Sequence, residues 1–265
     1  MIEIPLDPSF SLGPVRVAWH SFFSYVGLLA GAWLSFRCAR HFVKDQRIYP
    51  FAIAVVAGGL VGARAMHLLD SWPRYEGNPI EAFAIWNGGI GTMGAPLGST
   101  IAGFLAARRL RLPVGFMFDT TVIGIALGLA IGRIGDIVNG EHHTAECSGV
   151  PWCVGYTHPA TLGQPGPVHP VVAYDLAWDL VILAGTYALW RRVRGRQPEG
   201  RVWMLFLLLY GTGRVFSSSL RLDPQVWAGL QGGQLAGILY ALVGAGALLM
   251  TSQPSRWDIL QSRSR

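Results

Sequence analysis

Seven long apolar runs limit how this chain can fold more than any other feature. Each run covers about 20 residues, the length that an α-helix needs to cross a bilayer core of about 30 Å. Backbone polar groups in hydrocarbon must bond within their own segment, which favours helices for such runs. We therefore expect an all-α integral membrane protein with about seven transmembrane helices. The runs lie roughly at 19–37, 50–69, 88–107, 114–136, 171–190, 202–220 and 232–251.

Basic residues in the breaks between the runs predict the orientation of the chain. Fifteen of the 21 Lys and Arg residues fall in breaks that alternating spans place on one side. Only Arg16 and Arg74 fall in the opposite loops. Cytoplasmic loops carry an excess of Lys and Arg, so we expect the N-terminus outside and the C-terminus in the cytoplasm.

The low charged fraction indicates that the main partner of the chain is a lipid bilayer, and the distribution of arginines argues against nucleic acid as a partner. Only 14% of the residues are charged, whereas a soluble domain carries about 25%. The net charge is +6, but the arginines stand in short clusters between apolar runs and form no basic amphipathic face. We expect one polytopic membrane domain over residues 1–265, with the outside loop at about 140–170 as a small extracytoplasmic elaboration.

The stretch from Gly132 to Glu141 places an arginine and two carboxylates at the end of an apolar run. Charges at membrane depth cost about 2.5 to 3.5 kcal/mol each and are usually functional. Arg133 and Asp136 are three residues apart on one helical face, so they could simply neutralise each other. The alternative is that this cluster binds an anion.

Further arginines favour the interpretation that this region binds an anion. Arg64, Arg214 and Arg221 also lie in or at the ends of apolar runs, where arginines outnumber the obvious membrane carboxylates. A guanidinium matches phosphate oxygens in bidentate fashion, so a phosphate-bearing lipid headgroup would suit this excess. The alternative for Arg214 and Arg221 is that they snorkel to the outer interface.

Each of the other candidate residues has both a functional and a structural interpretation. Tyr210 shares a helical face with Arg214, where it could orient a substrate or merely belong to packing or to an aromatic belt. His169 could act in proton transfer or be an interfacial histidine bonded to backbone. Cys147 and Cys153 match no standard zinc spacing, even with the nearby histidines, so we expect a disulfide, no metal and no cofactor.

Taken together, these stretches resemble the phosphatidylglycerol–prolipoprotein diacylglyceryl transferase family. Gly132 to Glu141 is similar to the family signature G-R-x-G-N-F-I-N-G-E. His169 to Asp175 is similar to H-P-x-Q-x-Y-E, and Tyr210 to Arg214, followed by Arg221, resembles Y-G-x-x-R and E-x-x-R. The residues 12–20 look like the opening of the family, with His20 where a tyrosine often stands.

Three departures mark a divergent member. Met93 stands where many members have a histidine, and a methionine can neither take nor hold a proton. Ser218 replaces the glutamate between the two arginines, and Asp136 replaces an asparagine of the signature. Asp136 adds a negative charge that is expected to hold Arg133 in part and to leave more of the phosphate to Arg214.

The resemblance implies transfer of a diacylglyceryl group from phosphatidylglycerol to the lipobox cysteine of a preprolipoprotein, in a bacterial inner (cytoplasmic) membrane. A thioether forms and glycerol phosphate leaves. The alternatives are a noncatalytic lipid- or lipoprotein-binding relative and a small transporter. His142 is a further candidate for the base. The expected catalytic residues are Glu141, His169, Arg214 and Tyr210, and the expected phosphatidylglycerol-binding residues are Arg133, Asn139, Asp136 and Arg64.

Overall fold

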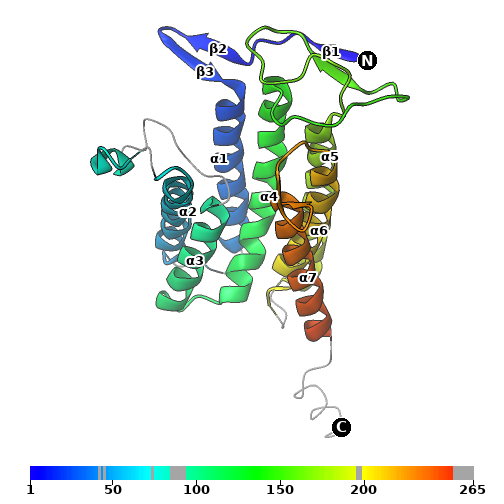
Figure 1. Ribbon diagram of the computed structural model, residues 1–265. Coiled ribbons are helices and arrows are strands. Elements are labelled where there is room, and N and C mark those ends of the chain that lie inside the picture. Colours follow the sequence, from blue (N-terminus) through cyan, green and yellow to red (C-terminus); the bar gives the residue numbers. More distant parts are fainter. Residues whose placement is uncertain (41–42, 44–45, 73–74, 84–93, 195–198, 253–265) are drawn as a thin grey trace, which may run out of the picture. The chain divides into compact units, whose positions relative to one another are not determined.

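Helices dominate the computed structural model, which describes the chain except residues 41–42, 44–45, 73–74, 84–93, 195–198 and 253–265 (Figure 1). The described residues contain seven α-helices near the predicted positions, and five of these are long and apolar enough to cross a membrane. The predicted start of the third span, at residue 88, lies outside the described residues. The helices are α1 (Trp19–Arg40), α2 (Ile48–Ser71), α3 (Gly94–Arg109), α4 (Val114–Asn139), α5 (Val171–Val193), α6 (Arg201–Ser219) and α7 (Gly232–Ser252).

Short strands connect the helices, and the all-α prediction did not include them. β1 (Ile2–Ile4) pairs in parallel with β4 (Val154–Tyr156), so that Ile2 lies opposite Val154. Two antiparallel hairpins accompany this pair. They consist of β2 (Ser9–Leu12) with β3 (Val15–Ala18), and of β5 (Gln225–Trp227) with β6 (Leu230–Gln231).

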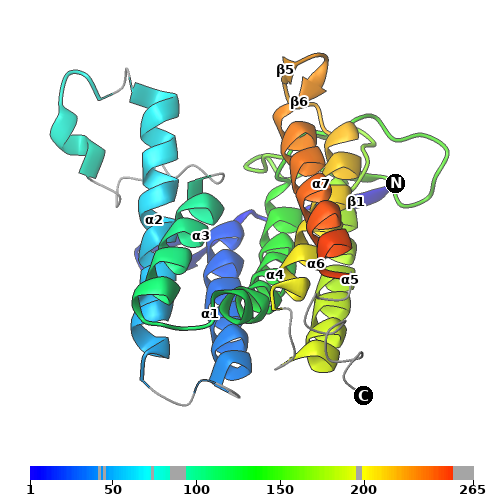
Figure 2. The same cartoon turned by 90° about the horizontal axis from the view of Figure 1, so that it is seen from below.

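The chain divides into two compact units, residues 36–118 and residues 1–35 with 119–265. In the first unit, α2 and α3 lie side by side (Figure 2) and approach closely through glycines. A Cβ atom on Gly62 would lie only 2.2 Å from the carbonyl oxygen of Gly94. Small residues at such contacts let membrane helices pack backbone to backbone.

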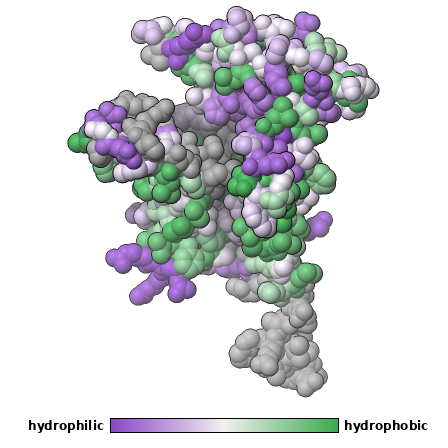
Figure 3. All heavy atoms as spheres, viewed as in Figure 1, coloured by the Kyte–Doolittle hydropathy of each residue, from purple (hydrophilic) through white to green (hydrophobic). Residues whose placement is uncertain are grey.

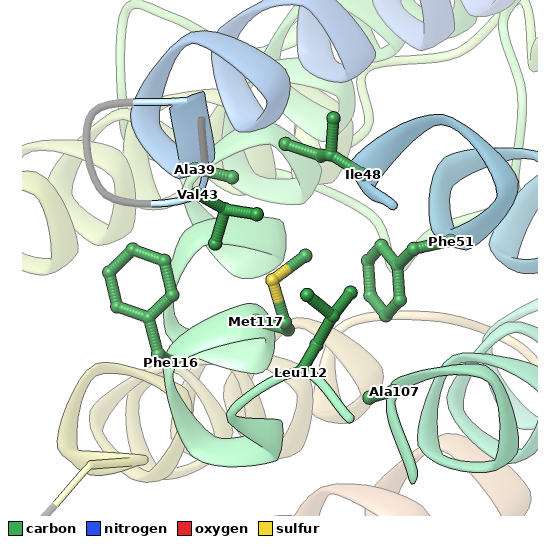
Figure 4. Packing of buried hydrophobic residues seen from close by; sticks show 8 residues of the cluster. All are labelled: Ala39, Val43, Ile48, Phe51, Ala107, Leu112, Phe116 and Met117. Atoms are coloured by element: carbon green, nitrogen blue, oxygen red, sulfur yellow. The ribbon is translucent and has the colours of Figure 1, made fainter. Parts of the chain in front are cut away.

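A hydrophobic cluster near the other end of these helices completes the first unit. Met117 is 1% exposed and lies among the clustered side chains (Figure 4). Aliphatic and aromatic groups from the ends of α1, α2 and α3 and from the start of α4 exclude solvent together. The cluster consists of Ala39, Val43, Ile48, Phe51, Ala107, Leu112, Phe116 and Met117.

The second unit also depends on close helix contacts. A Cβ atom on Gly31 of α1 would lie 2.4 Å from the carbonyl oxygen of Gly124 on α4. α6 and α7 lie side by side (Figure 2), and a Cβ atom on Gly211 would lie 2.4 Å from the carbonyl oxygen of Gly237. These contacts fix the helices that carry the polar residues described below.

Asp119 on α4 holds the start of α6. Its carboxylate accepts hydrogen bonds from the backbone N–H groups of Gly200 at 2.8 Å and Trp203 at 2.9 Å. The first N–H groups of a helix lack partners within the helix, and a carboxylate there also favours the helix dipole. Asp119 therefore has a structural role in joining two helices.

The segment between α4 and α5 carries polar residues, whereas the helix surfaces carry apolar ones, as Figure 3 shows. Cys147 and Cys153 form a disulfide in this segment, which confirms the predicted pairing. On α7, Leu242 and Met250 are 67% and 80% exposed. Such exposure suits side chains that face lipid.

Candidate functional site

Arg133 on α4 lies within a group of three aspartates. Its guanidinium is 3.1 Å from Asp136 on the same helix, 3.8 Å from Asp175 and 3.5 Å from Asp179 on α5. The Arg133 side chain is only 14% exposed. The prediction that Asp136 holds Arg133 in part is confirmed. Asp175 and Asp179 hold the same guanidinium as well.

Asp175 and Asp179 correct the charge count made from the sequence. They are four residues apart, so they share one face of α5. The sequence alone assigns no role to Asp179 and places Asp175 only within a motif. With them, Asp136, Asp175 and Asp179 equal in number Arg133, Arg214 and Arg221, so the expected arginine excess is wrong for this group of residues. Two carboxylates at helical spacing inside an apolar run were the signal that could have found them.

Arg221 follows α6 and does not snorkel to the outer interface. It is 2% exposed, and its guanidinium donates a hydrogen bond of 2.5 Å to Asp175. Burial, followed by the positive charge of Arg214, lowers its pKa below the usual range. The alternative interpretation, in which Arg221 snorkels to the outer interface, is therefore wrong, because Asp175 binds Arg221 inside the protein.

Arg214 on α6 has a different environment from the other two arginines. Within the described part of the chain its guanidinium makes no ion pair with a carboxylate. Gly233 of α7 leaves room beside it, since a Cβ atom there would lie 3.1 Å from Arg214 Nε and 2.4 Å from Ser218 Oγ. Ser218 is fully buried, and its hydroxyl has no hydrogen-bond partner among the described residues. Arg214 is thus available to an anion.

Tyr210 lies one turn before Arg214 and is packed among aromatic rings. Its ring stacks on Phe206, with centroids 5.5 Å apart, and is tilted against Tyr240 at 6.2 Å. The packing interpretation therefore holds for the ring. Its hydroxyl makes no hydrogen bond to the described residues, which leaves that group available to a substrate.

The end of α4 turns sharply beside the arginines. Gly140 adopts a left-handed backbone with φ of 73°, as residues just after a helix often do. Asn139 donates a 3.4 Å hydrogen bond to the carboxylate of Glu141 and accepts one of 3.4 Å from the backbone of His20. His20 also contacts Asp136 through Nδ1 at 2.5 Å. The sequence alone assigns no role to His20, yet this histidine is a second partner of Asp136 beside Arg133.

Glu141, His142 and His169 line one cavity of about 70 Å³. The structure thus brings together the three residues that we considered as bases. The backbone of His169 is bonded, since its N–H donates to Ala145 and its carbonyl accepts from the Thr144 hydroxyl at 2.8 Å. Its ring is directed to Tyr174, with Nδ1 3.4 Å from the hydroxyl. The ring therefore contacts a side chain and no backbone group among the described residues, and its role in proton transfer stays a prediction.

His142 is held neutral near pH 7. Desolvation and the positive charges of Arg221, Arg133 and Arg214 lower its pKa to about 4. Its backbone φ of 68° is rare for a residue with a side chain and costs about 1 to 3 kcal/mol. The tight turn after Gly140 is thus strained at the point where it faces the cavity.

One predicted binding residue, Arg64, belongs to a different compact unit from this cluster. There its guanidinium donates to the carbonyl of Glu81 at 2.8 Å and lies over the Tyr75 ring. Its predicted role in lipid binding stays a prediction. Met93, at the family's histidine position, lies outside the described residues.

Comparison with known proteins agrees with the resemblance. The family model described as prolipoprotein diacylglyceryl transferase matches residues 8–250. A protein of Dehalococcoides mccartyi named phosphatidylglycerol–prolipoprotein diacylglyceryl transferase is 32% identical over 248 residues, which cover 92% of this chain and 93% of that protein. Proteins of the same name from Gloeobacter violaceus and Corynebacterium glutamicum are 32% and 30% identical. These matches cover 89% and 94% of this chain, and 89% and 84% of those proteins.

Proposed function

Because the chain belongs to the prolipoprotein diacylglyceryl transferase family, we propose that it transfers the diacylglyceryl group of phosphatidylglycerol to a lipobox cysteine of a preprolipoprotein. The observation that carries the proposal is the contrast within the arginine cluster. Arg133 and Arg221 are bound by aspartates, whereas Arg214 has no carboxylate partner among the described residues. One guanidinium is thus left for a phosphate.

The reaction that this site would perform is a substitution at carbon. The cysteine sulfur attacks the glyceryl carbon that carries the phosphate ester, so a C–S bond forms as the C–O bond breaks. The electron pair of the broken bond stays on the phosphate oxygen, and glycerol phosphate leaves. The thiol proton goes to a base, because the thiolate is the nucleophile and a free thiol has a pKa of about 8.5.

Arg214 would stabilise the negative charge that grows on the leaving phosphate. Preorganised donors lower the barrier because they need no reorganisation as the charge develops. Arg133 would be a second donor, fixed in orientation by Asp136, Asp175 and Asp179. The Tyr210 hydroxyl and Asn139 would orient the headgroup beside these guanidinium groups.

Glu141 and His169 remain our candidates for the base. Both line the cavity at the end of α4, and Asn139 donates a hydrogen bond to Glu141. His142 is less suited, since a group with a pKa of about 4 is a weak base toward a thiol. Orientation with the N-terminus outside would place all three at the extracytoplasmic face.

Product mass distinguishes the enzyme from a noncatalytic relative. The purified chain, incubated with phosphatidylglycerol vesicles and a lipobox peptide, should add one diacylglyceryl group to the peptide cysteine. A peptide with serine in place of that cysteine is the matched control and should gain no mass. Binding of both peptides without any mass gain would support the lipoprotein-binding alternative and overturn the transferase.

A further inference from the structure

His20 and Asp136 are in direct contact, although each departs from the residue that is common in the family at its position. His20 Nδ1 lies 2.5 Å from Asp136 Oδ1, and this contact joins the start of α1 to the end of α4. Tyrosine often stands at the first position, and asparagine is usual at the second. The two departures therefore meet in one hydrogen bond and are best explained together.

The contacts of Asp136 determine which ring nitrogen of His20 carries a proton. Arg133 donates to Asp136 Oδ2 at 3.1 Å, and an ionised carboxylate can only accept hydrogen bonds. The hydrogen between His20 and Asp136 therefore belongs to Nδ1. A carboxylate at this nitrogen holds an imidazole in one orientation, and such an imidazole can carry a second proton on Nε2.

The second ring nitrogen of His20 is open to a ligand. The His20 side chain is 45% exposed, and Nε2 makes no hydrogen bond within the part of the chain that the structure describes. The backbone beside the ring is fixed, because a Cβ atom on Gly135 would lie only 2.7 Å from His20 Cα. In addition, the His20 N–H donates to Asn139 Oδ1 at 3.4 Å. A proton on Nε2 would thus be offered from a fixed position.

The neighbours of His20 place it with the headgroup residues and not with the candidate bases. His20 is not among the residues that line the cavity containing those bases. Its polar partners are Asp136 and Asn139, and Asp136 also holds Arg133. Arg133 and Asn139 are two of the residues that we propose to contact the headgroup. A group that gives up a proton here would therefore act on the phosphate.

We propose that His20 donates a proton from Nε2 to the leaving phosphate, with Asp136 as its positioning partner. The inference rests on the proposed function. As the C–O bond breaks, the phosphate gains a second negative charge, and a phosphate monoester takes up its second proton with a pKa of about 6. Transfer of the Nε2 proton to a phosphate oxygen removes that charge. The base holds the thiol proton and releases it to water, from which His20 is protonated again, so each turnover moves one proton from the thiol to the phosphate.

His20→Gln tests the donor, and His158→Gln is the matched control. A glutamine amide can donate a hydrogen bond to Asp136 but cannot transfer a proton. The single-turnover rate should fall by about 10²-fold, the usual contribution of a general acid, with little change in KM for phosphatidylglycerol. His158 also lies near a carboxylate, with Nε2 4.0 Å from Asp7, but outside the arginine cluster. Its loss should leave the rate and KM unchanged.

The pH profile distinguishes proton donation from a purely structural pair. The wild-type rate should fall at high pH as His20 loses its proton, and His20→Gln should lack this fall. The charged groups that act on the imidazole are Asp136, Arg133 and Glu141. Glu141→Gln should therefore move the fall along the pH axis without removing it. The same high-pH fall in His20→Gln as in wild type would overturn proton donation, as would a higher KM with an unchanged rate.

Exchange of both residues keeps the test valid if His20→Gln fails to fold. His20→Tyr and Asp136→Asn should each lower the rate by about tenfold or more, because each breaks the pair. The double variant combines the residues common in the family, and a tyrosine with a pKa of about 10 stays protonated beside the phosphate. It should therefore regain about tenfold over the single variants.

Two outcomes separate the inference from the proposed function. Single variants with wild-type rates, or a double variant no faster than the slower single variant, would overturn the role of His20 alone. Absence of product with wild-type enzyme would instead count against the proposed function.

Discussion

Arg133 and Arg214 belong to the same unit but have opposite surroundings. Arg133 contacts three aspartates from two helices, whereas Arg214 lies beside Gly233 and a buried serine with no carboxylate partner in the described residues. The first arrangement fixes a guanidinium, and the second keeps one available. The difference teaches that the neighbours of an arginine on an apolar helix decide whether carboxylates hold its guanidinium or leave it available.

Removal of Arg133 should give the largest effect. Arg133→Ala leaves Asp136, Asp175 and Asp179 without their common partner, and loss of one member of a buried ion pair costs about 3 to 5 kcal/mol. Thermal unfolding in detergent should show a marked loss of stability. An Arg133→Ala protein as stable as wild type would contradict the structural role of the aspartate group.

Removal of Arg214 should affect activity and not stability. Arg214→Ala should lower kcat by about 10²- to 10³-fold, the usual cost of losing one preorganised donor. Its unfolding temperature should stay near that of wild type, because no carboxylate loses a partner. Arg16→Ala is the control, since the Arg16 side chain is 64% exposed and contacts Asp7 and Ser9 on the surface. If Arg214→Ala keeps full activity, the phosphate assignment fails.

Gly233→Ala should disturb Arg214 without removing its charge. The added methyl would lie 2.4 Å from Ser218 Oγ and 3.1 Å from Arg214 Nε, so one of them must shift. Overpacking of this kind costs about 1 to 3 kcal/mol, and we expect activity to fall by about tenfold. Gly246→Ala on the same helix is the matched control, since nothing lies within 4 Å of its Cβ position. Equal activity of both variants would show that the gap at Gly233 is not needed.

The titration of His142 should report the field of the arginines. Its pKa of about 4 lies below the ordinary value of 6.5, so the unfolded chain binds a proton in this window and the folded chain does not. Stability should therefore fall as the pH falls from about 6.5 toward 4, and His142→Gln should flatten this slope. NMR of labelled histidine should show a higher pKa in Arg214→Ala. A normal His142 pKa in the wild-type chain would contradict the burial of His142 beside the arginines.

The helices were predictable because an apolar run long enough to cross a membrane can be recognised from consecutive residues alone. The short strands were not, since β1 has three residues and its partner β4 lies some 150 positions further along. Asp119 illustrates a similar limit. Its side chain interrupts an apolar run and stands where the family tends to have it, but neither fact indicates that its carboxylate holds the start of α6.

The site was predictable where its contacts are local. The Arg133–Asp136 pair lies within one helix, so spacing alone indicated it. Asp179 and Arg221 depend on contacts between distant segments, and the sequence indicated neither the buried Arg221–Asp175 pair nor the hold of Asp179 on Arg133. Ion pairs within one helix can be predicted from residue spacing, whereas ion pairs between helices can be predicted only when the fold is known.

The pairing of β1 with β4 has a consequence for how the chain is made. Ile4 precedes the helices in the chain, yet the cavity that it lines together with Glu141 also needs Val154 and Val172, which are synthesised much later. Closure of such a long loop costs entropy before any contact forms, and distant pairings form slowly. The cavity is therefore completed late in biogenesis. A nascent chain that has inserted only its first four helices still lacks this cavity.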